Sequence, residues 1–253
     1  MPAYAGLSSN ESVLKTSVRS ENPVINLSNQ SRQQFIASFM NRGYDPFKEV
    51  YLPHLDKLLE IIKQCDEPLE GNIFYLHNEI NLNHDFYADF LPKRRALALL
   101  AIMNSRIMEI GFNSGFSALL MLVANPDLKL TCIDICHHRY TKPCYEYLRS
   151  VFGDRIELID SNSLTAFPLL ARRQIDYDAY IIDGGHGVDV AEADITNVIS
   201  FGRRGSIICF DDSDYPPIRV LLDMYLLTGK LISIHDQIGF FDNLKQMFFI
   251  NNK

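Results

Sequence analysis

The sequence lacks three features that would tie it to a particular partner or environment: an excess of basic residues, a long apolar run and a dense cysteine pattern. Lys and Arg number 24 against 31 Asp and Glu, and the net charge of −7 repels nucleic acid and anionic membranes. The longest apolar run, Ala96–Met103, is far shorter than the roughly 20 residues that span a bilayer. We therefore expect neither a nucleic-acid partner nor a membrane partner.

The N-terminus also lacks a charged segment followed by an apolar core, so no secretory signal is expected. The chain holds only 5 cysteines, an odd and sparse set for its length. Such a set favours reduced thiols over a disulfide framework. Both observations predict a cytoplasmic protein.

With 253 residues, of which 47% are hydrophobic, the chain suits one large domain with an N-terminal appendage. Residues 1–34 are rich in Ser and Asn without periodicity, which predicts a flexible extension. Leu55, Leu58, Leu59 and Ile62 follow helical spacing, so residues 35–94 are interpreted as a helical cap or lid segment. Residues 95–253 are interpreted as the main domain.

Within the main domain, short apolar runs alternate with stretches of helical pattern. Continuous apolar runs are typical of strands buried on both faces of a parallel sheet, so we predict an α/β, Rossmann-like fold. The last two runs have no clear helix between them, which predicts an antiparallel last strand in a seven-stranded, mostly parallel sheet. The predicted strands are Arg106–Ile110, Lys129–Ile135, Ile156–Asp160, Ala179–Asp183, Ser206–Phe210, Leu231–Ile234 and Gln246–Ile250.

The turn after the first predicted strand is the most informative segment of the main domain. Gly111 and Gly115 permit a tight turn and a close approach of the backbone to a ligand at a helix N-terminus. Asp134 closes the second strand, where a carboxylate can accept both hydroxyls of a ribose. This arrangement predicts a nucleoside ligand.

Two nucleoside cofactors compete for this turn. A dinucleotide site normally needs a third glycine, but Asn113 stands at that position. Glu109, two residues before the first glycine, would repel a pyrophosphate and suits the cationic amino-acid portion of S-adenosylmethionine. We therefore favour S-adenosylmethionine, with a dinucleotide or a turn used only for packing as alternatives.

Acidic residues gather at the ends of the fourth and fifth strands. Asp183 precedes Gly-Gly-His186, and Asp211 and Asp212 follow the next strand. Carboxylates crowded together repel one another unless a cation lies among them, and oxygen ligands suit Mg²⁺, Mn²⁺ or Ca²⁺. In the alternative interpretation, Asp183 belongs to a plain turn, Asp212 or Ser213 caps the next helix, and His186 is a solvated loop residue.

Taken together, these motifs resemble those of class I S-adenosylmethionine-dependent methyltransferases over roughly residues 95–250. They are most similar to the branch of metal-dependent O-methyltransferases that act on natural-product sugars. The motifs are Glu-Ile-Gly-x-x-x-Gly-x-Ser, the aspartate after strand two, Ile-Asp-Gly-Gly-His and Phe-Asp-Asp.

The resemblance implies a role for each motif residue. It implies that the turn after the third strand flanks the adenine, although Ser161 or Ser163 could also act as a helix cap. It implies that His186 is the general base, with a pKa suited to this task, beside a catalytic Asp183. The implied metal ligands are Asp183, Asp211 and Asp212. The implied cofactor-binding residues are Glu109, Gly111, Asn113, Ser114, Gly115, Ser117, Asp134, Asn162, Ser163 and Asp183.

The resulting expectation is an enzyme that transfers a methyl group from S-adenosylmethionine to a small-molecule hydroxyl with the help of Mg²⁺ or another divalent cation. The resemblance also implies natural-product biosynthesis and a homo-oligomer, since this branch is often oligomeric. The alternatives are a metal-independent methyltransferase acting on N, C or carboxylate, and a non-catalytic S-adenosylmethionine-binding module. Zinc among Cys132, Cys136, His137, His138 and Cys144 is disfavoured because the spacing fits no common ligand pattern.

Overall fold

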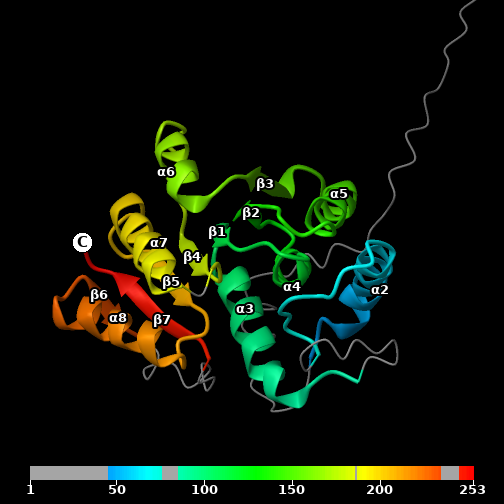
Figure 1. Ribbon diagram of the computed structural model, residues 1–253, viewed down its shortest axis with the longest axis horizontal. Helices are drawn as coiled ribbons and strands as arrows, with labels where there is room; N and C mark the ends of the chain where they lie inside the picture. The colour runs from blue at the N-terminus through cyan, green and yellow to red at the C-terminus, as the bar shows by residue number, and fades with distance from the viewer. Residues whose placement is uncertain (1–44, 76–84, 186, 235–244) are drawn as a thin grey trace, which may run out of the picture.

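The computed structural model describes residues 45–75, 85–185, 187–234 and 245–253. A three-layer α/β unit forms the body of the protein, with one further helix outside it (Figure 1). The helices are α2 Lys48–Gln64, α3 Leu91–Met103, α4 Phe116–Ala124, α5 Thr141–Phe152, α6 Ser163–Ala171, α7 Val188–Phe201 and α8 Pro216–Leu227, with short 3₁₀ turns at Ala88–Phe90 and Gly153–Arg155. The strands are β1 Arg106–Ile110, β2 Lys129–Asp134, β3 Ile156–Asp160, β4 Ala179–Ile182, β5 Ile207–Phe210, β6 Leu231–Ser233 and β7 Met247–Asn251.

The seven strands form one sheet in the order β3-β2-β1-β4-β5-β7-β6. Strands β1 to β5 pair in parallel, whereas β7 is antiparallel to both of its neighbours, β5 and β6. The predicted Rossmann-like sheet with an antiparallel last strand is therefore confirmed. The order reverses between β1 and β4, and in such sheets ligands bind beyond the carboxyl ends of the strands at this point.

The sheet is covered on both faces, as its continuous apolar strands predict. Helices α3, α4 and α5 cover one face and α6, α7 and α8 cover the other (Figure 1). Adjacent residues of β1 illustrate the two sides, because Ile107 belongs to the first apolar core and Met108 to the second. Both side chains are fully buried, as expected from the alternation of side chains along a strand.

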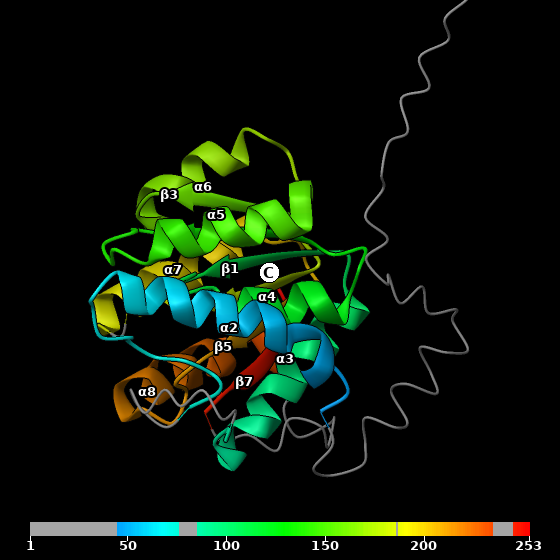
Figure 2. The same cartoon turned by 90° about the vertical axis from the view of Figure 1, so that its right-hand side faces the viewer.

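Helix α2 forms an outer layer that packs against α4 and α5 (Figure 2). Its buried side chains are Tyr51, Leu55, Leu58, Leu59 and Ile62, which confirms the helix predicted from their spacing. Helix α3 begins at Leu91 with Pro92 in its first turn, where the missing N–H of proline costs no hydrogen bond. The described part of residues 35–94 thus contributes to the same apolar core as α4 and α5.

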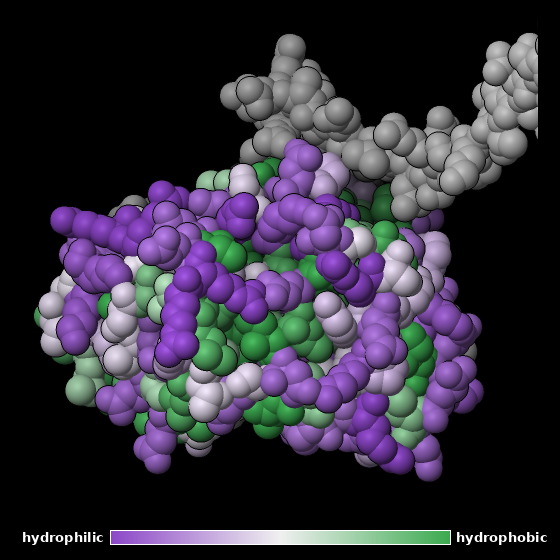
Figure 3. All heavy atoms as spheres, turned by 90° about the horizontal axis from the view of Figure 1, so that it is seen from above, coloured by the Kyte–Doolittle hydropathy of each residue, from purple (hydrophilic) through white to green (hydrophobic). Residues whose placement is uncertain are grey.

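All five cysteines are unpaired. Among the described residues, no helix combines the length and the hydrophobicity needed to cross a membrane. Strand β3 is one edge of the sheet. Seen from that side, the surface shows apolar side chains in its centre with hydrophilic side chains around them (Figure 3).

Candidate active site

The turn between β1 and α4 is built around glycines that no other residue could replace. Gly111 has a φ of +97°, and a Cβ added to it would lie 1.9 Å from the carbonyl oxygen of Asp183. Gly115 has a φ of +76°, and its Cβ would lie 2.5 Å from the ring of Phe112. Only glycine allows this backbone path at either position. The turn after β1 therefore lies in direct contact with the end of β4.

Asp134, at the end of β2, organises the neighbouring loops through its two carboxylate oxygens. Oδ2 accepts a hydrogen bond of 2.8 Å from the backbone N–H of Asn113, and Oδ1 accepts one of 2.7 Å from the N–H of Cys136. Asn113 and Cys136 both have positive φ values, of 52° and 53°. A carboxylate oxygen has two lone pairs, so each oxygen can accept a further hydroxyl. Asp134 thus holds the β1 and β2 loops together and keeps capacity for a ribose.

Glu109, in β1, is a fully buried carboxylate. The hydroxyl of Ser117 donates to its Oε1 at 2.5 Å, and the thiol of Cys132 donates to its Oε2 at 3.4 Å. Burial raises the pKa of Glu109 to about 7, although these two hydrogen bonds oppose the shift. Strand β1 lies between β2 and β4, so Glu109 lies between the β2 end and the β4 end of the site.

The turn after β3 holds the residues expected to flank an adenine. Asn162 is the N-cap of α6, and its Oδ1 accepts a hydrogen bond of 2.9 Å from the N–H of Leu164. The cap is therefore Asn162 and not Ser161 or Ser163, the two residues that the sequence offered for it. Ser163 is buried and hydrogen-bonds the carboxylate of Asp194, whose pKa burial raises. Ser114, in the glycine turn, is also buried.

Two apolar side chains that sequence reasoning missed stand exposed beside these loops. Ile135 follows Asp134 and is 57% exposed, and Leu164 follows Ser163 and is 51% exposed. Exposed large apolar residues at the ligand edge of a sheet are suited to covering a flat apolar group. In the sequence, only their positions directly after Asp134 and Ser163 could have indicated Ile135 and Leu164.

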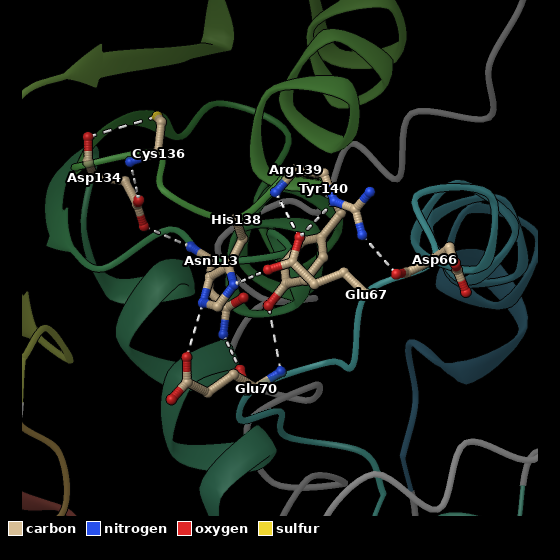
Figure 4. A network of polar contacts seen from close by, with 9 residues as sticks. All are labelled: Asp66, Glu67, Glu70, Asn113, Asp134, Cys136, His138, Arg139 and Tyr140. Atoms are coloured by element: carbon tan, nitrogen blue, oxygen red, sulfur yellow. Dashed lines mark hydrogen bonds and ion pairs between the residues drawn. The ribbon is translucent and has the colours of Figure 1, made fainter.

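A segment outside the main domain also reaches this edge, which the sequence did not predict. Residues 66–71, which follow α2, pass over the loops after β1 and β2, and we refer to them as the strap (Figure 4). The side-chain amide of Asn113 donates to the carbonyl oxygen of Glu70. Next to it, the hydroxyl of Tyr140 accepts a hydrogen bond of 3.3 Å from the N–H of Glu70.

The strap is fastened mainly through His138. Its Nδ1 lies 2.7 Å from Oε1 of Glu67 and its Nε2 lies 2.8 Å from Oε2 of Glu70 (Figure 4). The ring of His138 also stacks on that of Tyr140, with centroids 4.8 Å apart. The backbone N–H of Arg139 donates to Glu67 at 2.7 Å. Because these contacts involve Glu67, Glu70 and the loop after Asp134, the strap belongs to the candidate cofactor site.

The predicted aspartate cluster is present at the ends of β4 and β5. Asp183, Asp211 and Asp212 each offer an oxygen, and these three oxygens lie within 4.8 Å of one another. All three residues line one small pocket, with Gly184, Gly185 and Tyr215 beside them. Desolvation and the neighbouring Asp211 raise the pKa of Asp183 well above its ordinary value.

The alternative explanations for these aspartates find little support in the geometry. Helix α8 has Tyr215 as its N-cap residue, so neither Asp212 nor Ser213 caps it. Asp214, the next carboxylate after Asp212, is exposed and lies outside the cluster.

Lys93 is an unpredicted member of the aspartate cluster. It lies in the first turn of α3, is 8% exposed, and forms an ion pair with Oδ2 of Asp211. Burial lowers the pKa of Lys93, but the charges of Asp211, Asp183 and Asp212 outweigh this effect and keep it above its ordinary value. Lys93 is therefore an ammonium ion.

The donor set of the cluster fits a divalent cation. Oδ1 of Asp211 is buried and has no hydrogen-bond partner among the described residues, an arrangement that costs free energy unless a ligand is bound. Three carboxylates provide hard oxygen donors with room for water or substrate, as Mg²⁺ requires. With all three carboxylates ionised, as metal ligands are, and Lys93 counted, the formal net charge of the cluster is −2, which one divalent cation would balance. His186, the predicted base, lies outside the described residues.

The cysteines and histidines near β2 lie in different surroundings. Cys132 and Cys144 are buried in the apolar core. Within the described ranges, the only other group of potential metal ligands is Glu70 with His137 and His138. Both ring nitrogens of His138 already face carboxylates of the strap.

Comparisons with known proteins support a methyltransferase. Residues 108–213 match a protein family described as a methyltransferase domain. A comparison with curated protein sequences found no match.

Solved structures share the fold at low sequence identity. An O-methyltransferase from Bacillus cereus, in complex with S-adenosylhomocysteine, is 13% identical with a TM-score of 0.58, over 87% of this chain and 96% of that one. An O-methyltransferase from Streptomyces achromogenes, involved in tomaymycin synthesis and bound to S-adenosylmethionine, is 19% identical with a TM-score of 0.54, over 89% and 99%. A Podospora anserina methyltransferase bound to S-adenosylhomocysteine is 14% identical with a TM-score of 0.56, over 91% and 98%. Residues 108–213 are therefore similar to a methyltransferase domain, and the chain has the fold of the class I S-adenosylmethionine-dependent methyltransferases.

Proposed function

We propose that the protein transfers a methyl group from S-adenosylmethionine to a hydroxyl of a small natural-product molecule, with the help of a divalent cation. The observation that carries this proposal is the contact between the glycine turn and the aspartate cluster. A Cβ on Gly111 would collide with the carbonyl oxygen of Asp183, whose carboxylate belongs to the cluster. A methyl donor at the turn and an acceptor hydroxyl at the cluster would therefore be neighbours.

The cofactor would lie along the carboxyl ends of β1 to β4. Asp134 would accept the ribose hydroxyls, and Ile135 and Leu164 would cover the adenine, with Asn162 and Ser163 beside it. Glu109, together with Ser114, Ser117 and the glycine turn, would face the amino-acid portion. Because Glu109 is buried, a cationic ammonium near it would stabilise its ionised form.

The aspartate cluster would hold the divalent cation, most simply Mg²⁺, through Asp183, Asp211 and Asp212. When bound, the cofactor supplies an electrophilic sulfonium methyl and the cation lowers the pKa of a substrate hydroxyl. His186, three residues after Asp183, would accept the proton of that hydroxyl. The rigid strand ends would keep the hydroxyl in line with the methyl donor, which removes much of the entropic barrier.

Several observations support this function over its alternatives. Three solved neighbours bind S-adenosylmethionine or its product, and two of them are O-methyltransferases, one involved in tomaymycin synthesis. Oδ1 of Asp211 is buried and has no hydrogen-bond partner in the described part of the chain, which favours a cation over a metal-independent reaction. The unpaired cysteines are consistent with the cytoplasmic location that we propose.

The test combines calorimetry with a turnover assay. We expect the purified chain to bind S-adenosylhomocysteine and to methylate catechol or a model glycoside with radiolabelled S-adenosylmethionine only when Mg²⁺ is present. His186→Ala should lower turnover at least ~100-fold and change the Kd for S-adenosylhomocysteine by less than about twofold. Asp189→Asn, an exposed position in the first turn of α7, is the matched control.

Each contrary outcome points to a specific alternative. Turnover that persists in a chelator would support a metal-independent methyltransferase. Binding of S-adenosylhomocysteine without methylation of any acceptor would support a non-catalytic module. Loss of cofactor binding in His186→Ala would remove the role of His186 as the base.

A further inference from the structure

Lys93 enters the aspartate cluster from a different part of the chain than the aspartates themselves. It belongs to α3, before β1 and outside the matched residues 108–213. The Lys93 side chain is 10% exposed and that of its partner Asp211 is 2% exposed. A buried lysine is rare in proteins unless it is paired, so its position at the cluster needs an explanation.

The two oxygens of Asp211 have different surroundings. Oδ2 is bound to the Lys93 ammonium, whereas Oδ1 is buried without a hydrogen-bond partner among the residues that the structure describes. The ion pair therefore fixes the carboxylate by one oxygen and leaves the other available. Oδ1 is therefore the more available of the two oxygens for a cation.

The charges at the cluster show a second effect of Lys93. Without it, three carboxylates within 4.8 Å would repel one another in a poorly solvated site. With all three carboxylates ionised, as metal ligands are, Lys93 changes the formal net charge from −3 to −2, and repulsion is reduced before any other cation arrives. The same positive charge must also repel an incoming divalent cation.

We propose that Lys93 is a positioning residue that acts as a resident cation: it holds the aspartate cluster together in the metal-free protein and weakens the binding of the divalent cation. This inference rests on the proposed function in one respect, namely that the cluster binds such a cation. It implies that the cluster is assembled before metal binding and that the ion stays exchangeable.

The experiment measures metal binding directly, with Mn²⁺ alone as the probe and without cofactor or acceptor. We expect Lys93→Met to bind Mn²⁺ at least tenfold more tightly than the wild type in isothermal titration calorimetry. Lys93→Arg, which keeps the charge, should stay within about threefold. Lys142→Met is the matched control, because Lys142 pairs with Asp160 at the same edge of the sheet but is exposed, and should change the affinity by less than twofold.

Thermal unfolding provides a second readout. Metal-free Lys93→Met should unfold at a lower temperature than the wild type, and saturating Mn²⁺ should restore most of the difference. If this variant does not fold, Lys93→Gln serves in its place, because its amide still donates a hydrogen bond to Asp211 without a charge.

The inference is overturned if the neutral variants bind Mn²⁺ with the wild-type affinity or more weakly, or if neither they nor the wild type bind it. Titration of the same samples with S-adenosylhomocysteine distinguishes a failure of this inference from a failure of the proposed function. Failure of the wild type to bind S-adenosylhomocysteine, with the expected Mn²⁺ series, would contradict methyl transfer and leave the role of Lys93 intact. Cofactor binding with an unchanged Mn²⁺ series would contradict the role of Lys93 alone.

Discussion

Two buried carboxylates at the carboxyl edge of the sheet, Glu109 and Asp211, are stabilised in different ways. Glu109 is surrounded by neutral donors, the hydroxyl of Ser117 and the thiol of Cys132. Asp211 is paired with a full positive charge, the ammonium of Lys93. Neutral donors only partly offset the desolvation of a carboxylate, whereas an ion pair does so more completely but depends on both partners.

This difference separates the edge into two regions. In the region around Glu109 and Asp134, a protonated, neutral Glu109 is compatible with its neutral neighbours. A cationic ligand would favour the ionised form of Glu109. The region around Asp183 and Asp211 brings three carboxylates together with the Lys93 ammonium. The two regions meet at Gly111, which follows Glu109 by two residues and touches the backbone of Asp183.

The largest expected loss of stability comes from Gly111→Ala, which places a methyl group where the two regions are in contact. The added Cβ would lie 1.9 Å from the carbonyl oxygen of Asp183, at a φ of +97° that alanine avoids. We expect a loss of about 4 kcal/mol in the free energy of unfolding, and loss of S-adenosylhomocysteine binding. Urea denaturation and calorimetry measure the two effects.

The matched control for this variant is Gly205→Ala. Gly205 has a similar φ of +88°, but an added Cβ would have nothing within 4 Å. It should lose only about 1–2 kcal/mol, the cost of the backbone conformation alone. Equal losses in the two variants would show that the contact between the regions is unimportant.

The next largest effect on stability is expected when each of the two carboxylates, Asp211 and Glu109, is replaced by its amide. Asp211→Asn leaves the buried Lys93 with a weaker set of counter-charges, and we expect the metal-free protein to lose about 2–3 kcal/mol of stability. Glu109→Gln replaces a carboxyl that is mostly protonated at pH 6 with a neutral amide, and should change stability by less than about 1 kcal/mol at that pH. Denaturation of both variants at the same pH tests the comparison, and a larger loss in Glu109→Gln would contradict it.

The most gradual effect is a pH dependence that belongs to Glu109. Its pKa is about 7 in the folded protein against an ordinary value of 4.5, so the native state binds more protons between these values than the unfolded state. The free energy of unfolding should therefore fall as the pH rises from about 5 to 7, by up to about 1.4 kcal/mol per pH unit from this residue. Glu109→Gln should flatten this slope in urea denaturation series, and an unchanged slope would show that Glu109 does not titrate there.

Most of the fold was predictable from the sequence because its strands are short, apolar and separated by clear helical patterns. All seven predicted strands occur in one sheet, and the antiparallel pairing of the last two follows from the missing helix between them. The helix at Leu55–Ile62 was also predictable, since its apolar spacing is regular. Such local patterns determine element type, and the parallel sheet then fixes which ends lie together.

The candidate site was predictable only where motif and strand end coincide. The cluster of Asp183, Asp211 and Asp212 follows from the sheet, because β4 and β5 are neighbours. Lys93 and the strap could not be predicted, because their contacts join segments more than 40 residues apart with no periodic pattern to indicate them. Nothing in the sequence around Lys93, in the first turn of an apolar helix, indicates that its ammonium group is buried.

The strap has a consequence for how the protein keeps its ligand. Because Glu67 and Glu70 bind the loop that follows Asp134, the edge of the proposed cofactor site is completed by a chain segment that precedes the whole sheet in sequence. Release of the spent cofactor and loosening of α2 would then be linked events, since α2 leads directly into the strap. A change on the outer surface of α2, distant from any reacting atom, would in that case alter the residence time of the product.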